Sequence, residues 1–182
     1  MKIGIDIDDT ITQTYQTTLK YLKEYYPGFH IEKEENIYDK KTFEFLVNHI
    51  EDIQSSAELK PGVKEAMDTL KEMGFEIIII TARGGELDYD HARITEHYLK
   101  KHKLPYDKIY YGDINKGDAA LKENIDFFID DRIYNLDDVS VHGVDSLHFV
   151  DDLSIYSPYK KFDNWKDIIK YIKSKVVEKW EK

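Results

Sequence analysis

Short apolar runs recur along this chain, and each one ends in polar residues that can take part in chemistry. The runs are rich in isoleucine, phenylalanine and valine, which is typical of buried strands. They predict strands at residues 2–7, 75–80, 108–111, 125–129 and 147–150. The residues within or directly after the ends of these runs are mostly aspartate, threonine and glycine.

Between these runs, apolar residues recur at the three- and four-residue spacing of helices. The pattern predicts helices at 63–73, 88–103, 116–123 and 134–139, and a C-terminal helix over 165–176 that Asp163 or Asn164 caps. Strands that alternate with helices indicate an α/β fold, in which helices cover both faces of a mostly parallel sheet. Ligands bind at the carboxyl ends of the strands in such sheets, and the polar residues of this chain fall there.

Residues 12–61 depart from the alternation, because they contain no convincing strand pattern. Two amphipathic helices are expected, at 15–26 and 43–50, and Pro27–Gly28 ends the first. We therefore expect a helical cap subdomain at 12–61, inserted after the first strand of a catalytic core at 1–11 and 62–182. Six aromatic residues of the insertion either form its own core or stack on a nucleobase. They are Tyr15, Tyr21, Tyr25, Tyr26, Phe43 and Phe45.

The composition narrows the class of protein. The 182 residues include 26 Lys and Arg against 36 Asp and Glu, and the net charge of −10 argues against binding a nucleic acid polymer through charge. There is no cysteine, which excludes disulfides, thiolate metal sites and cysteine nucleophiles. No apolar run approaches the roughly 20 residues of a membrane span, and no secretory signal is recognisable. We expect a cytoplasmic protein without a membrane partner, and no feature indicates an oligomeric state.

Two groups of aspartates are candidates for a metal site. Asp6 and Asp8 are two residues apart on a predicted strand, so both side chains point to the same side of the sheet. Two carboxylates held together repel each other, and a hard divalent cation such as Mg²⁺ would offset the repulsion. Asp130 and Asp131, at the end of another predicted strand, can complete the shell of that cation.

Thr81 and Lys116 supply groups that bind an anion. Thr81 offers a hydroxyl at a strand end, and Lys116 offers a positive charge at the start of a helix, whose N-terminus itself favours anions. Together with the cation, these residues predict a site for a phosphate group.

The chain resembles the haloacid dehalogenase (HAD) superfamily, whose four motifs it matches in order: Asp6–Ile11, Ile80–Arg83, Lys116–Gly117 and Ile129–Asp131. The resemblance covers roughly residues 1–11 and 62–152 and implies a Rossmann-like, three-layer parallel sheet with a small helical cap. Within the superfamily, the chain is similar to the phosphatase branch of the 5′(3′)-deoxyribonucleotidases and bacterial nucleotidases. Its pointers are the short cap, the run Thr81–Gly84, Asp130–Arg132 with Asn135, and the late helix at Asn164–Trp165.

The resemblance also implies a role for each matched residue. Asp6 would attack phosphorus and form a phospho-aspartate, and Asp8 would protonate the leaving alcohol and then activate water. Asp6, Asp130 and the backbone carbonyl of Asp8 would hold Mg²⁺, with Asp131 beside them. The phosphate would be bound by Thr81, Ala82, Arg83 and Lys116.

We therefore expect a Mg²⁺-dependent phosphomonoesterase of a small phosphorylated metabolite, in the first place a (deoxy)nucleoside monophosphate. A phosphatase of sugar phosphates or other small metabolites is the alternative among enzymes. Outside catalysis, a phospho-accepting signalling domain of the receiver type combines similar residues, but there the acidic pair comes first in the chain. A binding module with a degenerate site is the third alternative, and the completeness of the motifs argues against it.

Four acidic residues carry expectations of their own. As a general acid near neutral pH, Asp8 needs a pKa raised from about 3.9 toward 7. We expect neighbouring carboxylates and cap closure to outweigh Mg²⁺ and Lys116 and to raise it in the closed state. Asp9 stands where many relatives have glycine, and it adds a negative side chain near an anionic substrate. Asp151 and Asp152 lie outside the motifs, and we interpret this pair as structural.

Overall fold

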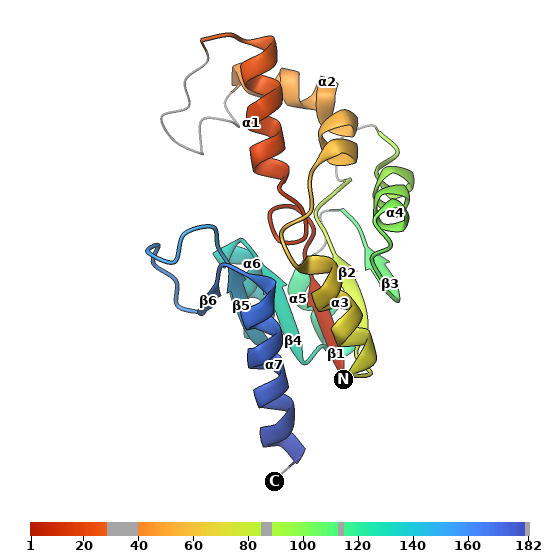
Figure 1. Ribbon diagram of the computed structural model, residues 1–182, viewed down its shortest axis with the longest axis vertical. Coiled ribbons are helices and arrows are strands. Elements are labelled where there is room, and N and C mark those ends of the chain that lie inside the picture. The colour runs from red at the N-terminus through yellow and green to blue at the C-terminus, as the bar shows by residue number, and fades with distance from the viewer. Residues whose placement is uncertain (29–39, 85–88, 113–114, 181–182) are drawn as a thin grey trace.

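A six-stranded parallel sheet forms the centre of the structure (Figure 1). This computed structural model describes residues 1–28, 40–84, 89–112 and 115–180. The order of the strands is β3-β2-β1-β4-β5-β6, and neighbours pair in parallel throughout. The strands are β1 (Lys2–Ile5), β2 (Glu76–Ile80), β3 (Lys108–Tyr110), β4 (Phe127–Asp130), β5 (Asp145–Phe149) and β6 (Lys160–Phe162).

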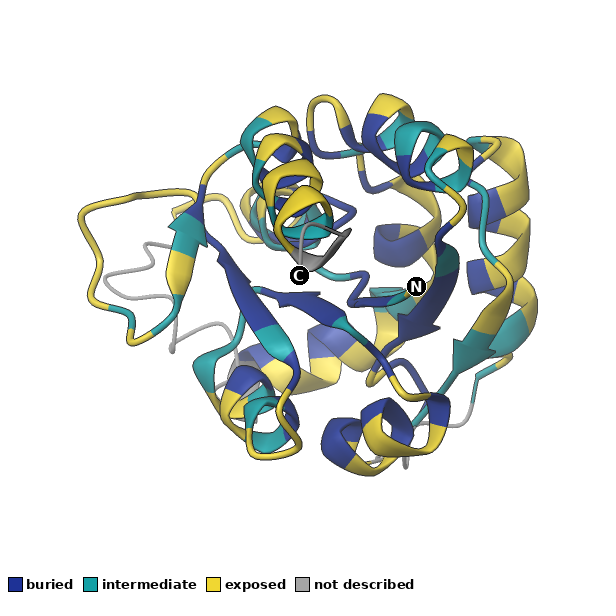
Figure 2. Cartoon of the chain, turned by 90° about the horizontal axis from the view of Figure 1, so that it is seen from below, coloured by how far each residue is buried: buried dark blue, intermediate teal, exposed yellow. Residues whose placement is uncertain are grey.

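Side chains from the strands enter two apolar clusters, one on each face of the sheet. Along β2, Ile77 and Ile79 belong to one cluster and Ile78 and Ile80 to the other, as the two-residue period of a strand requires. The first cluster is covered by α3 (Val63–Glu72), α4 (His91–Lys101) and α7 (Trp165–Trp180), and the second by α5 (Lys116–Glu123) and α6 (Ile133–Ser140). Figure 2 shows the sheet between these helical layers. The predicted three-layer α/β fold is confirmed.

The five strands expected from the sequence are present, with ends that differ by one or two residues. The sequence does not predict β6, because Lys160–Phe162 is only three residues long and two of them are lysines. This strand pairs with β5 at the edge of the sheet, where lysines discourage pairing with another chain. A strand of this kind depends on its neighbour and has no pattern of its own.

Polar side chains cap the N-termini of α7 and α4. At the start of α7, the Asn164 side chain accepts a hydrogen bond from the Asp167 N–H at 2.9 Å. Asn164 is one of the two residues predicted to cap this helix. Helix α4 begins at His91 because the Asp90 side chain accepts from the Arg93 N–H at 3.1 Å. Asp88, where we expected this helix to begin, lies outside the described residues.

Two helices, α1 (Thr14–Tyr25) and α2 (Lys40–Ser56), lie between β1 and α3 in the chain and beyond the carboxyl ends of the strands in space (Figure 1). They pack on each other through a third apolar cluster, made of Leu22, Phe45, Leu46 and Ile53. Both helices expected in the insertion are present, and the second is longer than expected. In the described parts of the chain, no helix combines the length and the apolar content that crossing a bilayer requires.

Candidate active site

Lys116 joins the carboxyl ends of two neighbouring strands. Asp6 directly follows β1, where its N–H donates to the Ile129 carbonyl at 3.0 Å, and Asp130 is the last residue of β4. Lys116 is the first residue of α5, and its Nζ lies 2.6 Å from Asp6 Oδ1 and 2.7 Å from Asp130 Oδ2. All three residues are buried. Two carboxylates therefore share one ammonium group in a place that water barely reaches.

Burial dominates the electrostatics of this group. Burial raises the pKa of Asp6 to about 7, although the Lys116 ammonium opposes the shift. Burial also raises the pKa of Asp131 well above its usual value, and the charges of Asp130 and Asp6 add to the effect. For Lys116, burial lowers the pKa, but the two carboxylates outweigh burial and raise it above its usual value. A further cation would stabilise the charged forms of these crowded carboxyl groups.

Three of the carboxyl groups are arranged to hold such a cation. One oxygen from each of Asp6, Asp130 and Asp131 lies within 4.8 Å of the other two. Asn135 Nδ2 donates to both oxygens of Asp130 at 3.0 Å, and the Arg132 N–H donates to Oδ1 at 2.8 Å, so that this carboxylate is fixed in place. Hard oxygen donors of this kind suit Mg²⁺. The residues present therefore fit the expected metal.

Asp8 lies in a different environment. Arg83 donates to its carboxylate twice, from Nε to Oδ2 at 3.0 Å and from Nη2 to Oδ1 at 2.7 Å, and Thr14 Oγ1 donates to Oδ1 at 2.6 Å. Burial raises the pKa of Asp8, but Arg83 and Thr14 outweigh burial and hold it below its usual range. The expected rise in this pKa is therefore wrong for this structure, because the expected balance did not include Arg83.

The segment after β2 carries the other residues expected to bind phosphate. Thr81 is buried, and its Oγ1 accepts from the Arg83 N–H at 3.2 Å. The Arg83 side chain is buried as well and turns to Asp8, with Nη1 donating to Thr95 Oγ1 at 3.4 Å. Ala82 is exposed and lines the cavity beside Asp6. Of these three residues, only Ala82 borders that cavity.

The cavity beside Asp6 has a volume of about 430 Å³ and lies between the insertion and the ends of the strands. On the side of the strands it is lined by Asp6, Asp8, Asp9, Ala82, Lys116, Asp131, Arg132, Tyr134 and Asn135. On the side of the insertion it is lined by Thr14, Thr18, Leu46, Ile50 and Ile53. A group of acids thus faces a largely aliphatic wall.

The six aromatic residues named above as candidates for stacking on a nucleobase do not line this cavity. Phe45 is part of the α1–α2 cluster, and Tyr25 and Tyr26 pack against its ring at 5.5 and 5.4 Å between centroids. Phe43 is half exposed on α2. The interpretation as a core of the insertion holds for Phe45, and Tyr15 and Tyr21 pack against the same cluster.

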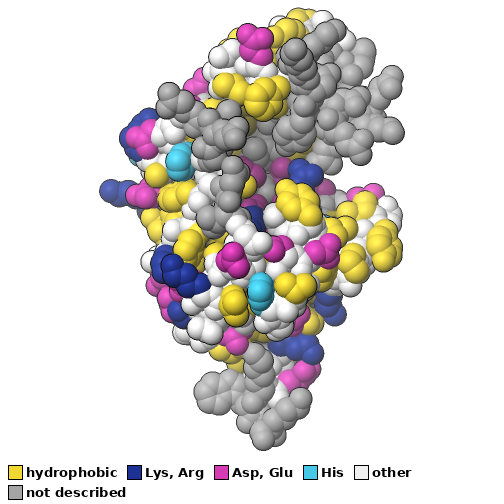
Figure 3. Space-filling view, turned by 180° about the vertical axis from the view of Figure 1, so that it is seen from behind, with side chains coloured by type: hydrophobic (Ala, Val, Ile, Leu, Met, Phe, Trp, Pro, Cys, Tyr) yellow, Lys and Arg dark blue, Asp and Glu magenta, His cyan; other side chains and the backbone are white. Residues whose placement is uncertain are grey.

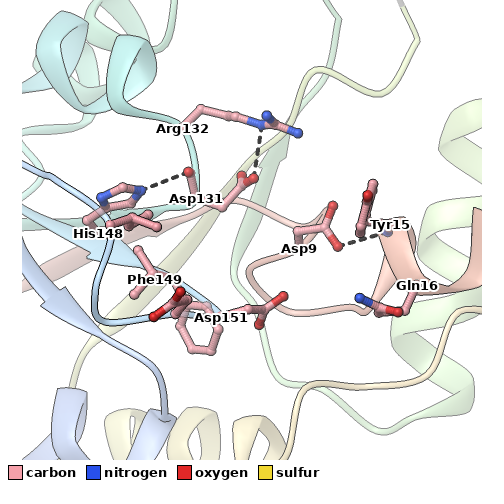
Figure 4. Close-up of a pocket in the computed structure, with 11 residues that line it drawn as sticks. Asp9, Tyr15, Gln16, Asp131, Arg132, His148, Phe149 and Asp151 are labelled. Atoms are coloured by element: carbon pink, nitrogen blue, oxygen red, sulfur yellow. Dashed lines mark hydrogen bonds and ion pairs between the residues drawn. The ribbon is translucent and has the colours of Figure 1, made fainter. Parts of the chain in front are cut away.

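A second cavity, of about 290 Å³, shares Asp9, Asp131 and Arg132 with the first (Figure 4). Here Asp9 Oδ1 accepts a hydrogen bond from the Tyr15 N–H at 2.8 Å. Asp151 also lines this cavity and forms an ion pair with the buried Lys60. Figure 3 shows that acidic side chains are spread over one face of the molecule, as the net charge suggests.

The sequence did not assign a role to several residues around the site. Thr14 contacts Asp8, and Tyr134 lines the cavity although its side chain is largely exposed. Leu46, Ile50 and Ile53 also line it, and their spacing of four and three residues places them on one helical face. This spacing could have predicted the aliphatic side of the cavity, but the same spacing is typical of any helix with a buried face.

Comparisons with known proteins bear on the fold. No protein-family model matches the sequence, and no curated protein matches it either. Among solved structures, a HAD-superfamily hydrolase from Ehrlichia chaffeensis is 21% identical, with a TM-score of 0.57 over 95% of this chain and 96% of that one. A protein described as a predicted phosphatase from Clostridium acetobutylicum is 16% identical, with a TM-score of 0.67 over 95% and 98%.

A HAD hydrolase from Bacillus subtilis, YfnB, was solved bound to magnesium and is 13% identical, with a TM-score of 0.64 over 93% and 97% of the two chains. Dehalogenases also occur among the similar structures. At these identities the similarity shows the fold, which is that of the HAD-superfamily hydrolases.

Proposed function

We propose that this chain, which has the fold of the HAD-superfamily hydrolases, is a Mg²⁺-dependent phosphomonoesterase that works through a phospho-aspartate on Asp6. The observation that carries the proposal is the buried contact of Lys116 with both Asp6 and Asp130, beside the carboxyl group of Asp131. A nucleophilic carboxylate, a fixed cation and ligands for a divalent metal are what transfer of a phosphoryl group requires. The similarity in fold to a protein described as a predicted phosphatase and to a magnesium-bound hydrolase supports the same function.

In the first step, an oxygen of Asp6 attacks phosphorus, the bond to the ester oxygen breaks, and the alcohol leaves with a proton from Asp8. In the second step, Asp8 takes a proton from water, the water oxygen attacks phosphorus, and Asp6 is released with inorganic phosphate. Mg²⁺ held by Asp6, Asp130 and Asp131 would neutralise charge on the non-bridging oxygens. Lys116 balances the charge of the nucleophile and keeps it oriented.

The contact between Arg83 and Asp8 favours one of the two proton transfers. With its pKa held low, Asp8 is charged and ready to accept a proton from water, as the second step needs. Protonation of the leaving alcohol in the first step needs Asp8 to carry a proton, and hence a weaker contact with Arg83. We therefore expect proton transfer to the leaving group to limit the rate for poor leaving groups.

The cavity supports a nucleoside monophosphate as substrate. Leu46, Ile50 and Ile53 form an aliphatic wall, and Tyr134 adds an aromatic side chain at the margin. A nucleobase has apolar faces that can pack on such residues, whereas the hydroxyl groups of a sugar phosphate would lose water against these three aliphatic side chains. We propose that residues 12–61 serve as the cap that contributes this wall.

The test is release of inorganic phosphate from a panel of nucleoside monophosphates, sugar phosphates and p-nitrophenyl phosphate, with Mg²⁺ and with EDTA. We expect activity with Mg²⁺ only, with the highest kcat/KM for a nucleotide, and loss of activity in Asp6→Asn. Asp68→Asn, at a partly exposed aspartate on α3 away from the cavity, is the matched control and retains activity. Wild-type protein that releases phosphate from no monoester would contradict the proposal.

Two other functions make different predictions in related assays. A halide leaving group needs neither a metal nor a proton donor, so a dehalogenase reading leaves the acidic cluster without a purpose; a 2-haloacid assay checks it. A receiver-type signalling domain holds its phosphate for minutes to hours, whereas we expect the phosphorylated protein to decay within seconds. Acid quenching after mixing with a labelled phosphate donor measures that lifetime.

A further inference from the structure

The first turn of α1 is bonded to the loop that carries the catalytic carboxylates. Thr14, the first residue of α1, donates its hydroxyl to Asp8 Oδ1 at 2.6 Å. Tyr15, the next residue, donates its N–H to Asp9 Oδ1 at 2.8 Å. Two consecutive residues of the loop are therefore each held by one of the first two residues of the helix.

Asp9 supplies an acceptor at the start of α1 that the side chain of the N-cap residue does not supply. Gln13 is the N-cap residue and makes no side-chain capping hydrogen bond, so the first N–H groups of the helix need other partners. The negative charge of Asp9 also suits the positive end of the helix dipole. Asp9 adopts a φ of 58°, and aspartate tolerates this left-handed conformation better than most other residues with a side chain. Its place in the loop is thus explained by the helix that follows.

The Thr14 hydroxyl has a defined direction. Its Oγ1 lies 2.7 Å from Thr12 Oγ1 as well as 2.6 Å from Asp8. A charged carboxylate can only accept a hydrogen bond, so Thr14 gives its single proton to Asp8. Thr14 also lines the cavity beside Asp6. The insertion therefore reaches the proposed proton donor directly.

We propose that Thr14 and Asp9 are positioning residues that hold the Asp8 carboxylate and the first turn of α1 in one fixed arrangement. Arg83 holds Asp8 from the side of the sheet, and Thr14 holds it from the side of the insertion. Without the Thr14 contact, Arg83 alone would orient the Asp8 carboxylate. The proton-transfer role of Asp8 rests on the proposed function, but the contact between α1 and the loop does not.

Kinetics with two kinds of leaving group test the Thr14 contact. In Thr14→Val, we expect kcat/KM for a nucleoside monophosphate to fall about 10- to 100-fold, because the alcohol needs a well-placed proton donor. For p-nitrophenyl phosphate, whose phenolate leaves without a proton, kcat/KM should change less than about threefold. Thr14→Ser restores the hydroxyl and should recover most of the loss.

Thr17→Val is the matched control, because Thr17 also carries a buried hydroxyl on α1 but donates it to the Gln13 carbonyl, at 2.9 Å. It should leave both values of kcat/KM unchanged. Equal losses on both substrates in Thr14→Val, or no loss on either, would overturn the role of Thr14. Wild-type protein without activity on either substrate would instead contradict the proposed function.

Hydrogen exchange tests the Asp9 contact without any assay of activity. In Asp9→Gly, the amide of Tyr15 loses this acceptor and should exchange about tenfold faster than in the wild type, as for loss of one hydrogen bond to a charged group. Asp9→Asn keeps Oδ1 as an acceptor and should stay within about twofold of the wild-type rate. An unchanged rate at Tyr15 in Asp9→Gly would overturn the proposal whether or not the protein is a phosphatase.

Discussion

Replacement of Lys116 by methionine tests whether one lysine and one metal ion neutralise the same carboxylates. The Lys116 side chain is 5% exposed and contacts Asp6 and Asp130, whose side chains are 8% and 0% exposed. Lys116→Met keeps an apolar chain of similar length but removes the charge. In the absence of a metal, two buried carboxylates are then left without a counter-ion and repel each other.

The loss of stability follows from that geometry. Removing one partner of a buried ion pair costs about 3–5 kcal/mol. In a domain of this size, each kcal/mol corresponds to roughly 2–4 °C in Tm, so we expect Tm in EDTA to fall by about 6–20 °C. Without the lysine, the raised pKa of Asp6 rises further. A carboxyl group with a raised folded-state pKa favours the folded state when protonated, so the deficit should grow from pH 5.5 to pH 8.5.

Thermal unfolding of both proteins, in EDTA and in excess Mg²⁺, measures the effect. A metal ion bound to the folded state stabilises it, and it replaces the missing charge in the variant, so Mg²⁺ should raise Tm more in Lys116→Met than in the wild type. Lys122→Met, at an exposed lysine on the same helix that contacts the Tyr110 ring but no carboxylate of the site, is the matched control and should change Tm far less. A Tm of Lys116→Met in EDTA within about 1 °C of wild type, or a fall that Mg²⁺ does not reduce, would refute this reasoning.

Three further substitutions, each at one position, have effects that follow from the contacts of the replaced residue. In Gly117→Ala the new Cβ would lie 2.4 Å from the Asp138 carbonyl oxygen, so we expect about 1–3 kcal/mol of destabilisation in urea unfolding, together with lower phosphatase activity because the start of α5 moves. Asn135→Ala frees the Asp130 carboxylate and should weaken Mg²⁺ binding roughly 10- to 100-fold in calorimetry; equal affinity would show that the amide does not orient this ligand. Hydrogen bonds from lysine and tyrosine side chains lower the pKa of Glu123 to about 2, so its stabilising effect is full above about pH 4.5 and is lost as the pH falls toward 2. The stability difference between wild type and Glu123→Gln should accordingly shrink between pH 5 and pH 2.5, and a difference independent of pH would contradict the assignment.

Much of the frame of this protein can be predicted from the sequence, because the patterns that define it are local. Alternation and apolar runs mark each central strand within a few residues, and parallel strands bring their carboxyl ends to one edge of the sheet. Asp6, Asp130 and Lys116 follow such ends or begin the helix that returns to them. Their position at one edge of the sheet could therefore be expected from the sequence, whereas their contact also requires β1 and β4 to be neighbours.

Only the tertiary structure decides which partner each charged group takes. Arg83 is 75 residues from Asp8 in the chain, and nothing local distinguishes a guanidinium that binds a substrate from one that binds a neighbouring carboxylate. The pKa of Asp8 depends on that choice. The sequence alone therefore led to the wrong direction for its shift. The aliphatic wall from α2 and the edge strand β6 are further cases, since Ile50 and Ile53 read as an ordinary buried helical face and β6 has no apolar run. Local patterns specify elements, whereas pairing between elements depends on distances in space that a single sequence does not contain.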